Sequence, residues 1–255
     1  MFSLLLFILV GIIIGLVGGG GGIFAIPTLV YGFHIDPLLA TFYSMIIVGS
    51  TSVIGTFLAH NRISWKTGFH FAIPSIIITV LTRRYILPTL PEHLWILEKS
   101  TYLLILFTFI MFASGCSMIC KKKSLSSAKN TYSTHGKILR TGLRGGVVGF
   151  ITGLVGAGVG FLIVPALMFF EGLEGKKAIA TSMSIISLNM LIGAAGRIPP
   201  EVDTAFLATL VFIAVGGLTI GLFLQKYLAS EHLTQGFGYF TMTAAVVMLS
   251  KELFF

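Results

Sequence analysis

Long apolar segments, separated by short polar or proline-containing turns, run along the whole chain. A helix needs about 20 mostly apolar residues to cross a bilayer, and most of these segments reach that length. The pattern therefore predicts an all-α polytopic membrane protein. The eight segments cover residues 2–33, 38–59, 67–90, 95–120, 138–170, 176–196, 203–225 and 233–250.

The two halves of the chain repeat one another. The sequence GLVGGGGGIFAIP, which starts at Gly15, returns as GLVGAGVGFLIVP, which starts at Gly153, so the offset is 138 residues. Seven of the thirteen positions are identical, and the same ungapped register places Ser44 on Ser182. Self-similarity at a fixed offset indicates a duplicated structural unit. We predict two homologous four-segment halves, a first transmembrane repeat at 1–120 and a second at 138–255.

Charge is scarce and unevenly distributed. Only 10% of the 255 residues are charged, against roughly 25% in a soluble domain, which excludes a soluble catalytic module. The linker at 121–137, together with Arg140 and Arg144, holds seven basic residues and no acidic one. Because cytoplasmic loops of membrane proteins carry an excess of Lys and Arg, we expect this linker to be cytoplasmic and the net charge of +8 to reflect topology rather than nucleic-acid binding.

The first segment of each half is too long for one straight crossing. Residues 2–33 would form a helix of about 48 Å, and the hydrocarbon core is about 30 Å thick. Clustered glycines lower helix stability and permit positive φ, so we predict that both first helices break at their glycines. These are Gly18, Gly20 and Gly22 in the first half and Gly156, Gly158 and Gly160 in the second.

Two topologies fit this pattern. The halves are parallel if each broken segment crosses the membrane completely, and inverted if each turns back as a re-entrant hairpin. Loop charge hardly separates the two. We favour inverted repeats, because shared midplane sites in transporters commonly lie between inverted repeats with discontinuous helices.

The doubled motif GxxGxGxG, followed five residues later by proline, is the strongest candidate for a binding site. Glycines let backbone N–H groups approach a ligand, and the half-helix that follows directs the positive end of its dipole to the same place. Both features favour an anion. The alternative is close helix packing through small residues. A dinucleotide fingerprint is excluded, since it needs a preceding strand in a soluble βαβ unit.

Uncharged hydrogen-bonding residues gather in the second segment of each half. Ser44 and Ser182 occupy equivalent positions and are candidates to contact an anion from two sides. Alternatively, such hydroxyls bond to carbonyl groups of their own helix. The other polar residues of these segments are Ser50, Thr51, Ser52, Thr181, Ser184, Ser187 and Asn189.

Ionisable residues stand near the segment ends. Arg197 closes the second segment of the second half, where it would either clamp an anion at a pore mouth or anchor the helix at the interface. All nine acidic residues fall at segment ends or in loops, which leaves no intramembrane carboxylate as a proton relay. The histidines lack ligand spacing, and Cys116 with Cys120 is a weak metal signal. We therefore expect no metal, no cofactor and no enzymatic activity.

These motifs resemble the TauE/SafE family, the sulfite exporter family of bacterial membrane proteins. The resemblance covers nearly the whole chain. The matching elements are Gly15-Leu-Val-Gly18 with Gly20, Gly22 and Pro27; Gly153 to Pro165; Ala180-Thr181-Ser182-Met183; and Gly55 with His60 and Ile63-Ser64-Trp65. One departure is that the first half has Phe42-Tyr43-Ser44 where the second has Ala180-Thr181-Ser182, which implies a narrower or specialised first-half site.

The resemblance implies a multi-pass transporter of the bacterial inner membrane that exports sulfur-containing anions such as sulfite or organosulfonates. We expect a central anion site formed by the two glycine breaks, Ser44 and Ser182, with Arg197 at its mouth. A small anionic substrate and membrane lipid are the expected partners, nucleic acid is not, and a homodimer stays open. Two alternatives share these features: a passive anion channel and a non-transporting membrane scaffold in which the glycines serve packing alone.

Overall fold

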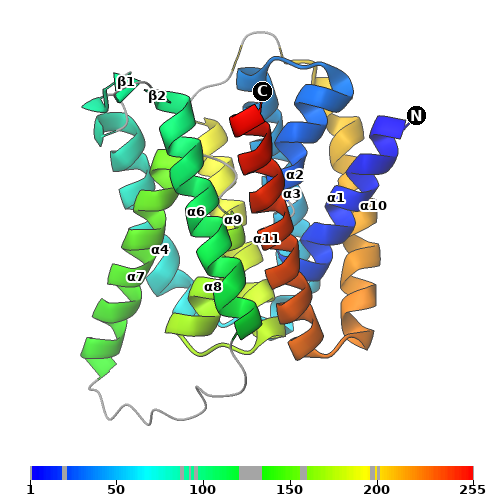
Figure 1. The fold of residues 1–255 in the computed structure, drawn as a ribbon. Helices are drawn as coiled ribbons and strands as arrows, with labels where there is room; N and C mark the ends of the chain where they lie inside the picture. The colour runs from blue at the N-terminus through cyan, green and yellow to red at the C-terminus, as the bar shows by residue number, and fades with distance from the viewer. Residues whose placement is uncertain are drawn as a thin grey trace.

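The fold is built mainly from long helices that run side by side along the molecule (Figure 1). The computed structural model describes residues 2–18, 22–86, 89–91, 93–94, 97–120, 134–155, 160–195, 199 and 202–254. The first half contains α1 (Phe2–Val17), α2 (Gly22–Pro27), α3 (Pro37–Leu58), α4 (Trp65–Leu81) and α6 (Lys99–Cys120). The second contains α7 (Thr134–Val155), α8 (Gly160–Phe170), α9 (Gly175–Ala195), α10 (Thr204–Tyr227) and α11 (Ser230–Phe254). The described strands are the two-residue β1 (His93–Leu94) and β2 (Leu97–Glu98), which pair antiparallel before α6.

The first helix of each half is broken at its glycines, and this confirms the prediction. α1 ends at Val17 and α2 begins at Gly22, while α7 ends at Val155 and α8 begins at Gly160. A π-helical turn at Thr28–Gly32 continues α2. α7 begins at Thr134, so the last four residues of the linker predicted at 121–137 are helical instead. Residues 121–133 lie outside the described part of the chain.

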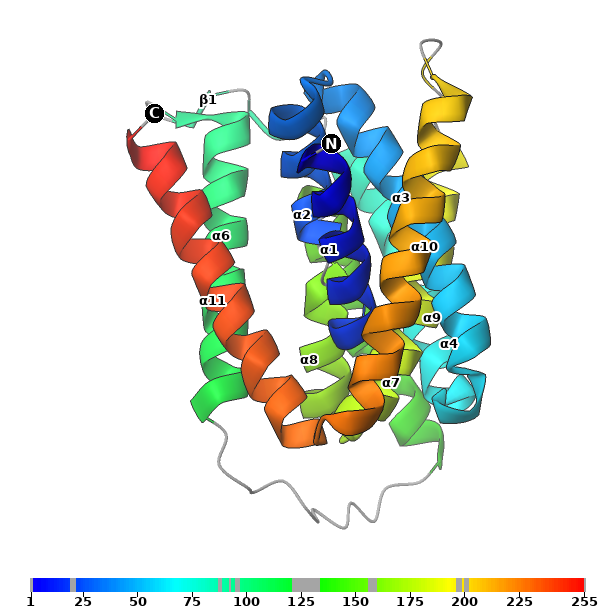
Figure 2. The ribbon, with the colours of Figure 1, turned by 90° about the vertical axis from the view of Figure 1, so that its right-hand side faces the viewer.

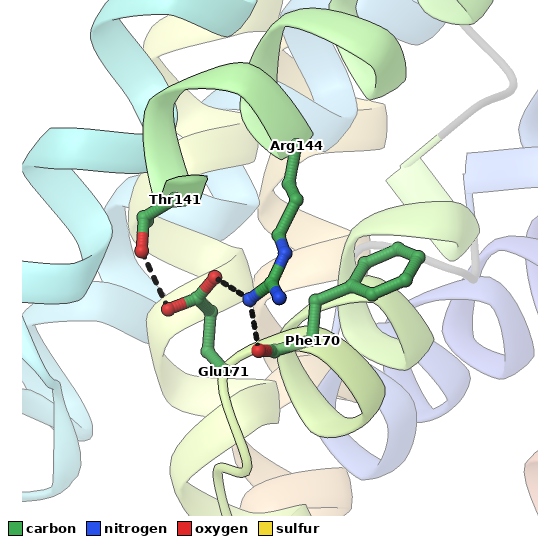
Figure 3. Close-up of polar contacts among 4 residues, drawn as sticks. All are labelled: Thr141, Arg144, Phe170 and Glu171. Atoms are coloured by element: carbon green, nitrogen blue, oxygen red, sulfur yellow. Dashed lines mark hydrogen bonds and ion pairs between the residues drawn. The ribbon is translucent and has the colours of Figure 1, made fainter. Parts of the chain in front are cut away.

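Each broken segment folds back on itself as a hairpin. Phe7, near the start of α1, contacts Phe33, just beyond the turn that continues α2, with ring centroids 5.9 Å apart. In the second half, Arg144 in the middle of α7 pairs with Glu171, just after the end of α8, at 3.0 Å (Figure 3). In both halves the chain therefore turns back toward the end of the molecule where the first helix began.

The helices of the two halves run in opposite directions. α1, α3 and α6 descend from the upper end in Figure 1, whereas α7, α9 and α11 ascend from the lower end (Figures 1 and 2). Both chain termini lie at the upper end, and α6 ends and α7 begins at the lower end (Figure 2).

The main helix pairs combine one helix from each half. α1 packs on α10 and α7 packs on α4, while α3 packs on α9 and α6 on α11. The 138-residue offset relates α1 to α7 and α4 to α10. The contact of α1 with α10 is therefore equivalent to the contact of α7 with α4. The two halves therefore share their helix contacts rather than forming separate bodies.

Glycines allow the closest of these contacts. A Cβ atom at Gly11 or Gly15 of α1 would collide with the backbone of α10 at Ala214 or Leu218. On α7, Gly145 and Gly149 lie in the same way against the backbone of α4. Small residues that let two backbones approach are the usual means of joining membrane helices. The packing interpretation therefore holds for these four glycines of α1 and α7.

The helices have the length and composition of membrane spans. Among the described residues, three helical stretches are long and apolar enough to cross a bilayer: Leu39–Leu58, Gly175–Ala195 and Thr204–Tyr227. Large apolar side chains also cover the outside, for example Phe212 on α10, which is 79% exposed. An apolar outer surface belongs in lipid, which supports the prediction of a membrane protein.

Candidate functional site

The tip of the first hairpin lies against α9. Gly18 ends α1 in the left-handed conformation, with φ of 81°, and its backbone N–H donates to the Ile14 carbonyl at 2.8 Å. A Cβ atom on Gly18 would lie only 2.6 Å from Oγ of Ser182. A left-handed glycine after a helix end is a common way to stop a helix, and here it also brings backbone into contact with a serine of the other half.

The outgoing arm of the same hairpin lies against α3. Gly22 is buried at the start of α2, and a Cβ atom there would lie 3.2 Å from Cγ2 of Val48. The break in α1 therefore lies between α9 and α3, the two helices that pack on each other across the halves. The structure brings together Gly18, Gly22 and Ser182 of the predicted site.

For five other residues of the predicted site, the structure gives no contact of this kind. Gly160 begins α8, and α8 contacts both α2 and α9. The remaining four lie outside the described residues: Gly20, Gly156, Gly158 and Arg197.

The paired serines are buried, and their hydroxyl groups are already engaged. Ser44 and Ser182 are 2% and 0% exposed. Oγ of Ser44 donates to the Thr41 carbonyl and Oγ of Ser182 to the Ile179 carbonyl, each at 2.8 Å. These are bonds within the helix, as the alternative interpretation expects. Each oxygen can still accept a hydrogen bond, and substrate binding by the two serines stays a prediction.

A second equivalent pair joins the halves beside the serines. Oγ1 of Thr181 accepts from the backbone N–H of Ser64 at 3.0 Å, just before α4. The hydroxyl of Tyr43 accepts from the backbone N–H of Asp203 at 2.8 Å, just before α10. The first backbone N–H groups of a helix lack partners within it, so α3 and α9 each hold the start of a helix of the opposite half.

The end of α1 is also held by a buried amide. Gln225 of α10 is 2% exposed, and its Nε2 donates to the carbonyls of Gly15 and Leu16 at 3.5 Å. Its Oε1 accepts from Nη1 of Arg62 at 3.2 Å. Gln225 therefore provides hydrogen bonds to helix-end carbonyls where α1 stops, and links them to Arg62, in the short helical turn (His60–Arg62) that follows α3.

The comparison with known protein families agrees with this architecture. The family model described as "Sulfite exporter TauE/SafE" matches residues 3–248. The chain belongs to the TauE/SafE family. A similar protein of Xylella fastidiosa (strain 9a5c), named "Probable membrane transporter protein", is 28% identical over 253 residues, which cover 96% of this chain and 92% of that protein. "Probable membrane transporter protein YunE" of Bacillus subtilis (strain 168) is 27% identical over 225 residues, covering 75% and 77%. No solved structure matches the chain significantly.

Two contacts of the candidate site in this TauE/SafE protein were not predicted from the sequence. Gln225 is a single amide near the end of an apolar run, and that isolation is a signal for a buried partner. Tyr43 and Thr181 are repeat equivalents that both carry a hydroxyl, although their side chains differ in size. In the described part of the chain, no group of His, Cys, Asp or Glu residues has the arrangement of a metal site.

The second hairpin of the TauE/SafE protein is closed by a polar cluster (Figure 3). Glu171 accepts from Oγ1 of Thr141 at 2.6 Å and from Nη1 of Arg144 at 3.0 Å. The same guanidinium donates to the Phe170 carbonyl at the end of α8 and lies 5.3 Å from the Phe170 ring centroid. The first hairpin has aromatic rings, Phe7 and Phe33, at the corresponding place. The two hairpins therefore differ in how their arms are joined.

The variant Glu171→Ala is expected to loosen the second hairpin. Glu171 is only 12% exposed, so its loss leaves Thr141 and Arg144 without their carboxylate and costs about 1–3 kcal/mol. This corresponds to a fall in the unfolding temperature of roughly 2–4 °C per kcal/mol, measurable by thermal unfolding in detergent. Glu174→Gln changes an exposed carboxyl beyond the same hairpin and should have no such effect. Equal unfolding temperatures for both variants would refute a structural role of the cluster.

Proposed function

We propose that this TauE/SafE protein is a carrier that exports small sulfur-containing anions, such as sulfite or organosulfonates, across the bacterial inner membrane without catalysing a chemical reaction. The observation that carries the proposal is the break in α1. Gly18 lies left-handed against Ser182, and Gly22 starts α2 against Val48. Interrupted helices at the contact between two halves are where transporters bind their substrates. The description of the matching family supports the choice of anion.

The charge distribution supports an anionic rather than a cationic substrate. The acidic residues near α3 and α10 serve helix starts: Asp203 accepts from the N–H groups of Ala205 and Phe206 at 3.0 Å, and Asp36 accepts from that of Leu39 at 3.4 Å. Residues 37–58 of α3 contain no charged side chain. A cation pathway would need acidic groups facing the middle of the membrane.

The proposal includes inverted repeats and a cytoplasmic lower end. The opposite directions of corresponding helices and the return of each hairpin to its starting end support it (Figures 1 and 2). The linker of residues 121–133 connects helices at the lower end, and its Lys121, Lys122, Lys123 and Lys129 favour the cytoplasm there. Movement of the mixed helix pairs against one another around the glycine breaks would then expose the anion site to each side in turn.

Anion flux from proteoliposomes tests the proposed function. Vesicles carrying the purified protein are loaded separately with one of the anions sulfite, sulfoacetate, thiosulfate, phosphate or chloride, or with taurine, a zwitterion without net charge at neutral pH. A carrier of this class gives saturable flux of the sulfur-containing anions and none of phosphate or chloride. Flux that rises without saturation would indicate a channel instead. If a folded preparation moved none of these anions, the scaffold interpretation would replace the proposal.

A further inference from the structure

A set of buried polar groups on α3 and α9 has no hydrogen-bond partner among the residues that the structure describes. Thr51 and Ser52 of α3 are both 0% exposed. Their hydroxyl groups, and both amide atoms of Asn189 on α9, are buried and bond to no other group in the described part of the chain. Most buried polar groups in proteins are hydrogen-bonded, and those that are not call for an explanation.

These groups differ from the other hydroxyls of the same helices. Ser44, Ser182, Ser184 and Ser187 each donate to a carbonyl of their own helix, at 2.8–2.9 Å. A serine or threonine in a membrane helix has this internal partner within reach. The unpartnered groups are therefore not a general property of α3 and α9 but a local one.

The three residues lie at one level, where α3 crosses α9. A Cβ atom on Gly49 would lie 3.2 Å from Cβ of Met190, and one on Gly55 would lie 2.8 Å from Sδ of Met183. The two helices are therefore antiparallel here, and positions 51 and 52 are level with positions 187–189. The repeat offset of 138 also relates Thr51 to Asn189, so the unpartnered groups of the two halves meet at equivalent positions.

The same helix faces lead to the glycine break. Val48, which contacts Gly22, precedes Thr51 by about one turn, and Ser182, which contacts Gly18, precedes Asn189 by about two turns. Residues that are three, four or seven positions apart share a face of a helix. The break of α1 and the unpartnered polar groups therefore border a common region of the α3–α9 contact.

The chemistry of this set limits what it can hold. It offers two hydroxyls and an amide NH₂ as donors, together with the amide Oδ1 as an acceptor. Residues 37–58 and 178–195 contain no charged side chain. Without a cation on these two segments, desolvating a dianion is far more costly than desolvating a monoanion, and a ligand with a donor of its own would satisfy Oδ1 of Asn189.

We propose that Thr51, Ser52 and Asn189 form a substrate subsite for a singly charged oxyanion that also carries a hydrogen-bond donor. The inference rests on the proposed transport function and specifies the substrate class of the same site. Among sulfur anions it favours a hydroxyl-bearing sulfonate over methanesulfonate, which has no donor, and over sulfoacetate, which has two charges.

Flux of 2-hydroxyethanesulfonate and methanesulfonate through proteoliposomes tests the subsite. Wild-type protein should have a lower KM for the hydroxyl-bearing anion. Asn189→Leu and Thr51→Val should each raise that KM about tenfold, the effect of one lost hydrogen bond to a charged group. Thr241→Val is the matched control, because Thr241 is also 0% exposed but donates within α11 at 2.9 Å; its KM should stay that of the wild type.

Thermal unfolding separates a binding role from a structural one. Replacing an unpartnered buried polar group by an apolar one of similar shape is neutral or stabilising, so Asn189→Leu should unfold at the wild-type temperature or above while its KM rises. Wild-type KM in both variants, or a rise in KM accompanied by lower thermal stability, would overturn the subsite while leaving the carrier intact. Absence of any sulfonate or sulfite flux in the wild type would overturn the transport function itself, and the subsite with it.

Discussion

Gly18→Ala is expected to reduce anion flux through proteoliposomes at least tenfold. Two effects add at this position. A φ of 81° costs a residue with a side chain about 1–3 kcal/mol, and the new methyl group would lie 2.6 Å from Oγ of Ser182. Either α1 continues past its break or α9 moves away. Both outcomes change the geometry of the proposed anion site.

Two other glycines separate these effects. Gly172 has a φ of 67° but open space around it, so Gly172→Ala has the backbone cost alone. Gly216, inside α10, has neither constraint, and alanine there should be neutral or slightly stabilising. We expect flux to be nearly unchanged in both controls. A Gly18→Ala protein that transports like the wild type would show that the break does not need its observed conformation.

Gly11→Val is expected to have the largest effect on stability. A Cβ atom at Gly11 would overlap the backbone carbonyl of Ala214, and a backbone cannot move aside as a side chain can. α1 and α10 would have to separate along their length. Overpacking of a close contact costs about 3 kcal/mol or more when no side chain can yield. Purified protein should therefore unfold well below the wild-type temperature, or fail to accumulate in the membrane.

The equivalent pair in the other half offers a parallel experiment. Gly149→Val should act in the same way, because a Cβ atom there would overlap the carbonyl of Ser75 on α4. Gly216→Val, on α10 but with open space around it, controls for the poorer helix propensity of valine. If Gly11→Val and Gly149→Val were as stable as Gly216→Val, close backbone contact would not be what joins these helices.

The breaks could be predicted from the sequence because they depend on local rules. A run of 32 apolar residues exceeds the membrane thickness, and glycine is the residue at which a helix stops most readily. Gly18 and Gly22 therefore marked the end of α1 and the start of α2 closely. The 138-residue offset likewise predicted which positions would be equivalent, and the crossed contacts of Tyr43 and Thr181 follow it.

The partners of individual side chains could not be predicted in this way. Gln225 reaches Gly15 across a separation of 210 residues, and nothing in the local pattern of α10 indicates this carbonyl. Ser44 and Ser182 are equivalent in sequence, yet their hydroxyls bond within their helices, whereas the amide of Asn189 lacks a partner in the described chain. Such differences depend on how two helices meet, which a single sequence does not specify.

The exchange of helices between the halves constrains the order in which the protein can be made. α1 is complete once residue 17 has been synthesised, but its partner α10 is complete only at residue 227. Domains generally assemble from the N-terminus during synthesis, and here the helix that covers Gly11 and Gly15 belongs to the C-terminal half. During biogenesis, the face of α1 that carries Gly11 and Gly15 therefore stays exposed to lipid or to the insertion machinery until nearly nine-tenths of the chain has been inserted.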